Sequence, residues 1–141
     1  MPLITVTFAS AHKELASKAA IAAEVNRLSA TLLDNDPKVT AIIVQRVETE
    51  DWFARGRSLA DAGRASFWLD IHVTEGNKTK DQKAKFIAAV FSAMGNLLGP
   101  LHEESYAYVH EARGDAYGFG GLTQEQRYIA GKLAVSVAAA A

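Results

Sequence analysis

The stretch "SFWLDIHVTEGNKTKDQKAKFIAAVFSAMGNLLGPLHEESYAYVHEA", residues 66–112, joins segments of two different periods. Residues 66–75 alternate in character from one position to the next, which is the period of a β-strand. One face of this strand receives the apolar side chains Phe67, Leu69, Ile71 and Val73. The other face receives larger aromatic and polar groups, Trp68, Asp70 and His72. We therefore predict a strand with two chemically different faces.

A helix is predicted directly after this strand. The turn "GNKTKDQ" (76–82) offers Asn77 or Thr79 as a helix cap, and "GP" (99–100) ends the helix. Between them, residues 83–98 carry an apolar stripe at helical spacing: Phe86, Ile87, Val90, Phe91, Met94, Leu97 and Leu98. Residues 105–112 then predict another strand. The order strand, helix, strand is a βαβ unit, in which the two strands run parallel.

The first half of the chain follows the same plan. Residues 3–8 predict a β-branched strand, residues 12–33 a helix, and residues 39–47 a second strand. The large apolar residues of this helix recur at helical spacing: Ile21, Val25, Leu28 and Leu32. A shift of about 65 residues aligns the halves, matching Lys13 with Lys78, Lys18 with Lys83, Ala19 with Ala84, Val25 with Val90, Leu32 with Leu97, Leu33 with Leu98, and Gly56 with Gly121.

We therefore predict an α+β fold in which two tandem βαβ units form a four-stranded sheet with both helices on one face. The first unit covers residues 2–62 and the second residues 63–128, within a single domain of residues 1–133; residues 134–141 are a tail of low information. Two helices cannot cover both faces of such a sheet. Because a parallel sheet seldom leaves one face bare, we expect that face to contact other subunits.

Composition excludes several classes of function. The 141 residues suit one domain, and the net charge of −1 indicates neither a nucleic-acid partner nor an anionic membrane surface. The chain has no cysteine, which excludes disulfides and thiolate nucleophiles. No signal peptide or membrane-spanning run is recognised, so we expect a cytoplasmic protein.

Three features together carry a resemblance to a known family. They are Pro2 after the initiator, the doubled βαβ plan, and the glycine-rich "DAYGFGGLT" (115–123) after the fourth strand. Over residues 2–128 the chain resembles the tautomerase superfamily, which includes 4-oxalocrotonate tautomerase, macrophage migration inhibitory factor and fused two-unit relatives. "IHVTEGNKTKDQKAKFI" (71–87) is also similar to a strand and early helix of 4-oxalocrotonate tautomerase. The resemblance implies the β-α-β fold of that superfamily, a terminal β-hairpin and a homotrimer.

The resemblance implies that Pro2 is the catalytic residue, acting as a general base once Met1 is removed. A secondary amine beside an apolar wall loses hydration of its charged form, so its pKa falls toward neutrality. A base with a pKa near the working pH transfers protons most effectively. The implied activity is that of an isomerase, a tautomerase that interconverts the keto and enol forms of small acids without a cofactor.

Candidate substrate-binding residues lie outside the N-terminus. The turn "EDWFARGRSL" (50–59) carries Arg55 and Arg57, whose guanidinium groups suit a carboxylate, beside Trp52 and Phe53, which offer an apolar wall. Lys38 stands just before the second strand, where the resemblance implies a pocket lysine.

Four aromatic or imidazole side chains are predicted on strands. Tyr106 and Tyr108 share one side of the fourth strand, and the resemblance implies that they face an active site, where a phenol can donate to a substrate carbonyl. His72 and His110 match no helical or hairpin metal signature. We interpret these two histidines as packing or subunit-contact residues and predict no metal site.

The chain also departs from the family pattern. The arginine that follows "EG" in the single-unit enzyme corresponds to Asn77 in the second half and to His12 in the first. Thr74 and Asn77 stand where dehalogenating relatives carry arginines, which argues against haloacrylate hydration. Two alternatives remain open: a decarboxylase or hydratase acting on a small semialdehyde or unsaturated acid, and a non-catalytic trimeric interaction protein.

Overall fold

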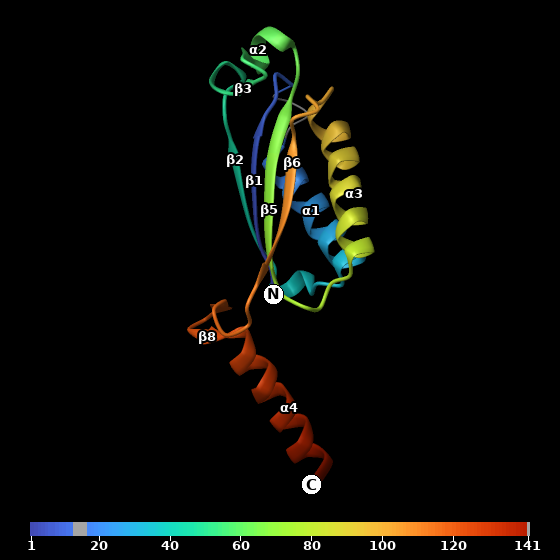
Figure 1. Cartoon of the computed structure of the whole chain (residues 1–141), viewed down its shortest axis with the longest axis vertical. Coiled ribbons are helices and arrows are strands. Elements are labelled where there is room, and N and C mark those ends of the chain that lie inside the picture. The colour runs from blue at the N-terminus through green and yellow to red at the C-terminus, as the bar shows by residue number, and fades with distance from the viewer. Residues whose placement is uncertain (13–16, 141) are drawn as a thin grey trace.

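The computed structural model describes residues 1–12 and 17–140, in which four strands form the main sheet (Figure 1). In spatial order they are β2 (Ala41–Arg46), β1 (Leu3–Ala9), β5 (Ser66–Thr74) and β6 (Tyr106–Ala112). Strand β1 runs parallel to β2, and β5 runs parallel to β6. The two central strands, β1 and β5, are antiparallel, so the halves are related as by a twofold axis. The predicted fold class is confirmed.

Two long helices, α1 (Lys18–Leu33) and α3 (Lys80–Leu98), cover one face of this sheet (Figure 1). Ser17 caps α1, so the described helix begins at Lys18 and the expected start at His12 is wrong; residues 13–16 of the predicted helix lie outside the described residues. Thr79 caps α3 in a reciprocal pair of hydrogen bonds with Gln82, which starts that helix at Lys80 rather than at Lys83.

The core lies between the sheet and these helices. Residues of α3 four positions apart form one stripe and are fully buried or nearly so: Phe86, Val90, Met94 and Leu98. They meet the predicted inner face of β5, and Phe67, Leu69, Ile71 and Val73 are all buried. Ile87 and Phe91 were expected in the same stripe, but they are 40% and 41% exposed. Each follows a buried residue by one position, a rotation of about 100° around the helix.

A small hairpin follows each βαβ unit, as the sequence predicted for residues 115–123. The first is β3 (Phe53–Ala54) with β4 (Arg57–Ser58), and the second is β7 (Gly118–Phe119) with β8 (Leu122–Thr123). Gly56 and Gly121, which the 65-residue shift aligns, have φ of +78° and +82° in the two turns. A side chain is strained at such angles, so both turns favour glycine.

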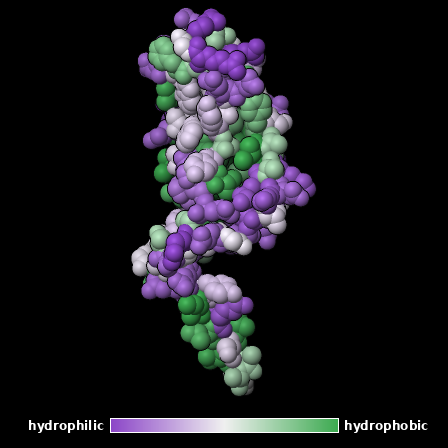
Figure 2. Space-filling view, in the orientation of Figure 1, coloured by the Kyte–Doolittle hydropathy of each residue, from purple (hydrophilic) through white to green (hydrophobic). Residues whose placement is uncertain are grey.

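Further helices follow the hairpins and connect the strands. They are η1 (Pro37–Val39), η2 (Thr49–Asp51), α2 (Leu59–Ala62) and α4 (Gln124–Ala140). Helix α4 projects away from the sheet in Figure 1 and contains residues 134–140, to which the sequence assigned no element. Its apolar residues Ile129, Leu133 and Val137 are exposed, and Figure 2 shows the apolar surface that this helix presents. None of the helices in the described part of the chain has the length and apolar character needed to cross a bilayer.

The second face of the main sheet is not covered by helices. Cross-strand pairs on this face join Trp68 to Tyr106, Asp70 to Tyr108, and His72 to His110. Tyr106 and Tyr108 are 52% and 51% exposed. Large aromatic groups therefore lie on an open sheet surface, as the alternation in residues 66–75 indicated.

Candidate active site

Pro2 lies at the start of β1, where the antiparallel pairing brings it beside the end of β5. The residue is buried, and its carbonyl oxygen accepts a hydrogen bond of 3.1 Å from the Ala41 N–H at the start of β2. Proline has no backbone N–H to donate to a neighbouring strand, and it is tolerated at the start of a strand. Pro2 is thus held at the end of β1, between β2 and β5, rather than extended into solvent.

Tyr117 closes over this end of β1 from the loop before the second hairpin. Its hydroxyl donates to the Met1 carbonyl oxygen at 2.7 Å and accepts from the Leu3 N–H at 3.1 Å. Burial raises the pKa of Tyr117, an effect that the Leu3 N–H partly opposes. The side chain is therefore a neutral phenol at physiological pH, able to donate one hydrogen bond beside Pro2.

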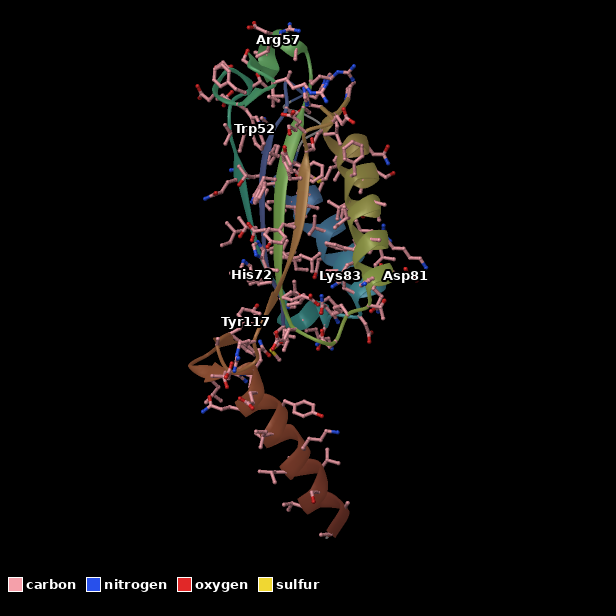
Figure 3. All side chains as sticks on the ribbon, in the orientation of Figure 1. Trp52, Arg57, His72, Asp81, Lys83 and Tyr117 are labelled. Atoms are coloured by element: carbon pink, nitrogen blue, oxygen red, sulfur yellow. The ribbon has the colours of Figure 1, made fainter. Side chains whose placement is uncertain are left out.

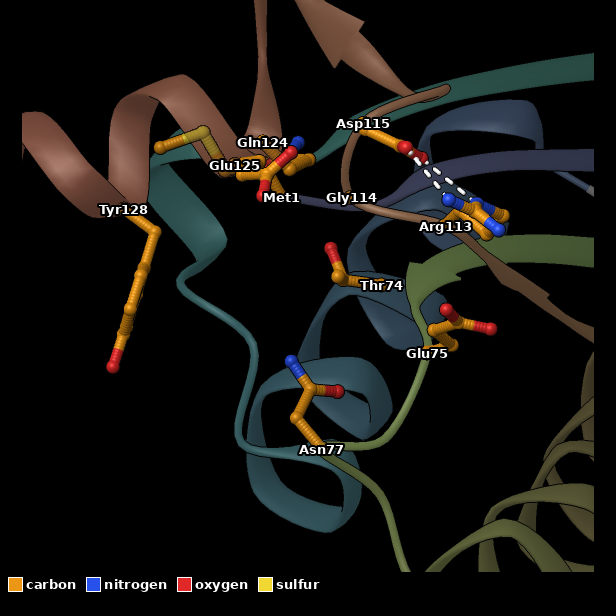
Figure 4. A pocket seen from close by; sticks show the side chains of 10 residues that line it. All are labelled: Met1, Thr74, Glu75, Asn77, Arg113, Gly114, Asp115, Gln124, Glu125 and Tyr128. Atoms are coloured by element: carbon orange, nitrogen blue, oxygen red, sulfur yellow. Dashed lines mark hydrogen bonds and ion pairs between the residues drawn. The ribbon is translucent and has the colours of Figure 1, made fainter.

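A cavity of about 480 Å³ opens at the same end of the sheet (Figure 4). Its lining comes from the first residue, the end of β5, the loop after β6 and the start of α4. The lining residues are Met1, Thr74, Glu75, Asn77, Arg113, Gly114, Asp115, Gln124, Glu125 and Tyr128. Segments from both ends of the chain therefore enclose one space next to Pro2.

The cavity lining carries charges of both signs. Arg113 binds Asp115 through two hydrogen bonds of 2.9 and 2.7 Å, drawn as dashed lines in Figure 4. This contact lowers the pKa of Asp115 and raises that of Arg113, so the pair stays ionised. The side-chain nitrogen of Gln124 is buried and has no hydrogen-bond partner within the described residues.

The electrostatic environment disfavours a positive charge on the chain-terminal amine. Burial lowers the pKa of the Met1 amino group most, the Lys78 ammonium lowers it further, and Asp36 opposes both. Lys78 itself has a lowered pKa because it is partly buried, with Asp34 opposing the shift. An amine at this position is therefore available as a free base at lower pH than an exposed one.

The structure separates several predicted binding residues from Pro2 within one chain. Arg55, Arg57, Trp52 and Phe53 belong to the first hairpin region, beyond the far end of the strands. The length of β1 puts roughly 20 Å between the two ends. Figure 3 places Trp52 and Arg57 at one end of the molecule and His72 and Tyr117 toward the other. Lys38, by contrast, lies in η1, directly before the segment that bonds to Pro2.

The first hairpin has partners of its own. Arg55 forms ion pairs with Glu103 at 2.8 Å and Glu104 at 3.4 Å, and Arg57 donates to the Asp61 carbonyl at 2.9 Å. Trp52 is partly buried against a small cluster below the hairpin, whereas Phe53 is 67% exposed. Tyr106 and Tyr108 lie on the open sheet face, where Tyr106 contacts the Trp68 ring and Tyr108 the His110 ring.

Sequence reasoning missed three residues of this site: Tyr117, Lys78 and Gln124. A signal existed for two of them, because the 65-residue shift aligns Tyr117 with Trp52 and Lys78 with Lys13. The hydrogen bonds confirm the first of these relations: Trp52 O accepts from Leu59 N, and Tyr117 O accepts from Gln124 N, both at 2.8 Å.

Comparison with solved structures identifies the fold. A fused 4-OT wild-type symmetric trimer matches with a TM-score of 0.75 at 19% identity, covering 89% of this chain and 98% of that one. A malonate semialdehyde decarboxylase inhibited by 3-bromopropiolate matches with a TM-score of 0.67 at 18% identity, over 92% and 96% of the two chains.

A member of the cis-3-chloroacrylic acid dehalogenase family is also similar, with a TM-score of 0.66 at 19% identity, over 89% and 90% of the two chains. No family model matches the sequence, and no curated protein does. The structural likenesses confirm that the fold is that of the tautomerase superfamily.

Proposed function

We propose that this chain, which has the tautomerase-superfamily fold, is a cofactor-independent keto–enol tautomerase of small acids with Pro2 as its general base. The observation that carries the proposal is the buried position of Pro2 between Met1, which lines the cavity, and Leu3, with the Tyr117 hydroxyl hydrogen-bonded to both of these neighbours. Removal of Met1 would turn the Pro2 nitrogen from an amide into a secondary amine. That amine takes a proton from one position of the substrate and returns it to another.

Tyr117 supplies the matching hydrogen-bond donor. While Met1 is present, the phenol donates to the Met1 carbonyl at 2.7 Å. Loss of Met1 removes this acceptor and leaves the longer contact of 3.4 Å to the His72 carbonyl, from which the hydroxyl can turn to the carbonyl oxygen of a substrate. Donors aimed at a developing enolate oxygen stabilise the transition state more than the ground state. Lys78 adds a positive charge nearby.

Carboxylate binding is proposed to come from other subunits. Two further carboxylates, Glu75 and Glu125, line the cavity together with the Arg113–Asp115 pair, so one chain alone offers little net positive charge there. Arg55 and Arg57, with Trp52 and Phe53, lie at the opposite end of the sheet from Pro2. They can approach Pro2 only when they belong to a neighbouring subunit. We assign them, with Lys38, Tyr106 and Tyr108, to substrate binding in the assembly.

The assembly is predicted to be a homotrimer. Relatives of the same fold are described as fused 4-OT symmetric and asymmetric trimers. The open sheet face, with Tyr106 half exposed, is the surface expected to join the subunits. Sedimentation equilibrium at micromolar concentration should give the mass of three chains. Tyr106→Lys should favour dissociation, because it adds a charge to that face, whereas Ala88→Lys on the exposed side of α3 should leave the mass unchanged. A parent chain that sediments as a monomer contradicts this prediction.

The pH dependence of turnover is predicted to have an ascending limb set by the Pro2 amine. Burial and Lys78 lower the pKa of the Met1 amino group, one residue before Pro2. We expect the same two effects to act on the Pro2 amine once Met1 is removed, so activity should rise at lower pH than an exposed amine would allow. Lys78→Met removes one of the two lowering effects and should move the limb to higher pH. Lys80→Met is the control, since Lys80 is exposed and does not contribute to the shift. Limbs that coincide in the parent and the Lys78 variant contradict this account.

The substrate is to be found by a screen of enol-pyruvates and semialdehydes with the processed chain. A decarboxylase is the second candidate, supported by the likeness to malonate semialdehyde decarboxylase. Release of CO₂ from a semialdehyde acid, without accumulation of the keto tautomer, distinguishes it. An intact mass that retains Met1 in the native host favours instead the non-catalytic interaction protein.

A further inference from the structure

Three potential metal ligands meet on the open face of the sheet, in a group that the proposed proton transfer does not use. They are Asp70 and His72 on β5 and His110 on β6, and one ligand atom of each lies within 4.8 Å of the others. His72 Nε2 is 3.0 Å from Asp70 Oδ1, and His110 Nε2 is 3.9 Å from the same oxygen. Two ligands on one tetrahedral zinc ion are roughly 3.3 Å apart, given bonds of about 2.0–2.1 Å. Both distances to Asp70 therefore need to change by less than 1 Å.

The backbone fixes the relative position of these side chains. Asp70 and His72 stand two residues apart on β5 and so share one face, and His110 is the direct cross-strand partner of His72. The two imidazole rings are stacked, with centroids 4.4 Å apart and an angle of 4° between their planes. Because an imidazole ligates through a lone pair in its ring plane, both side chains must rotate out of this parallel stack before their Nε2 atoms can share one ion with Asp70 Oδ1. Strand β5 is central and β6 is the edge strand paired with it, so the ladder between them fixes the backbone of all three ligands.

A neighbouring side chain orients the carboxylate. The Trp68 indole N–H donates to Asp70 Oδ2 at 3.0 Å, which leaves Oδ1 directed toward the histidines. Hydrogen bonds to the second oxygen of a ligating carboxylate are typical of protein metal sites, where they hold the ligand in place. In the single chain the ligand side chains are also accessible to solvent, at 37%, 31% and 19% exposure for His72, His110 and Asp70.

We propose that Asp70, His72 and His110 bind one divalent transition-metal ion, with Zn²⁺ as the representative ion. Two imidazoles and one carboxylate suit zinc and its first-row neighbours, whereas Mg²⁺ and Ca²⁺ prefer all-oxygen sites. Three protein ligands leave at least one position open to water or to a donor from another subunit. The sequence led us to interpret both histidines as packing residues, because the set is assembled across two strands and has no local spacing. The site does not depend on the role of Pro2.

Titration calorimetry of the full-length chain, stripped with EDTA, tests the proposal with Zn²⁺. We expect one Zn²⁺ per chain, and binding at least about tenfold weaker in His72→Gln and in His110→Gln. His12→Gln is the matched control, with the same substitution at a histidine outside the cluster, and should bind as the parent does. Excess Mg²⁺ should not displace the zinc.

A conservative variant separates loss of the site from loss of the fold. Trp68→Phe keeps all three ligands and removes only the hydrogen bond to Asp70, so it should weaken Zn²⁺ binding about ten- to a hundredfold. Circular dichroism and sedimentation establish that each variant is folded and assembled as the parent is. The proposal is overturned if the parent does not bind Zn²⁺, or if folded His72→Gln and His110→Gln variants bind it as tightly as the parent.

Discussion

Turnover of an enol acid by the Pro2→Ala variant is expected to be about a hundred- to ten-thousand-fold slower than that of the parent, the usual contribution of a general base. Alanine leaves a primary amine whose direction is no longer fixed by a ring. Most binding contacts of the cavity persist, because its lining comes from other residues. The loss should therefore appear in kcat more than in KM.

The measurement is steady-state turnover of a substrate from the screen, with processing of Met1 established for each variant by intact mass. Pro100→Ala provides the matched control: it is an exposed proline in the loop after α3, outside the cavity, and should retain the parent rate. Equal rates for Pro2→Ala and the parent would falsify the proline mechanism, whatever the fold.

The largest expected effect on stability comes from Phe86→Ala. Phe86 is fully buried in α3 against the sheet, so its truncation removes apolar contacts and leaves a cavity. We expect the free energy of unfolding to fall by about 3–5 kcal/mol. Ile87→Ala, one position along the same helix, should cost about 1 kcal/mol or less, because Ile87 is 40% exposed.

Urea unfolding at one fixed chain concentration measures both variants, since assembly makes apparent stability depend on concentration. Equal losses for the two variants would mean that the helix is rotated relative to the sheet described above.

The strands and the two long helices could be predicted because their signals are local, whereas the strand order and the antiparallel pairing of β1 with β5 were not predicted. The alternation in residues 66–75 assigned Leu69 and Trp68 to opposite faces of the strand. A spacing of four residues marked Phe86, Val90 and Met94 as core. The same pattern could not decide whether Ile87 and Phe91 are buried, because an apolar stripe in the sequence does not specify the width of the contact between helix and sheet.

Of the residues at this end of the sheet, the sequence singled out Pro2 and Lys38 as candidates. Tyr117 reaches Met1 across almost the whole chain, and no local pattern encodes a contact of that sequence separation. Lys78 lowers the pKa of the Met1 amino group, and the proximity of these two residues again depends on the tertiary fold. The sequence marked residues 50–59 as a turn, yet the relation of this hairpin to Pro2 depends on subunits that a single sequence does not place.

The antiparallel pairing of β1 with β5 gives each subunit two similar ends, but a chain has only one beginning. The 65-residue shift aligns Pro2 with Phe67, whose nitrogen is an amide in the middle of the chain. In the proposed trimer, six geometrically related ends would share three reactive amines. Gene fusion thus halves the number of possible proton-transfer centres and frees the other three ends to diverge. A circular permutation that opens the chain before residue 67, with proline placed there, would exchange the two roles.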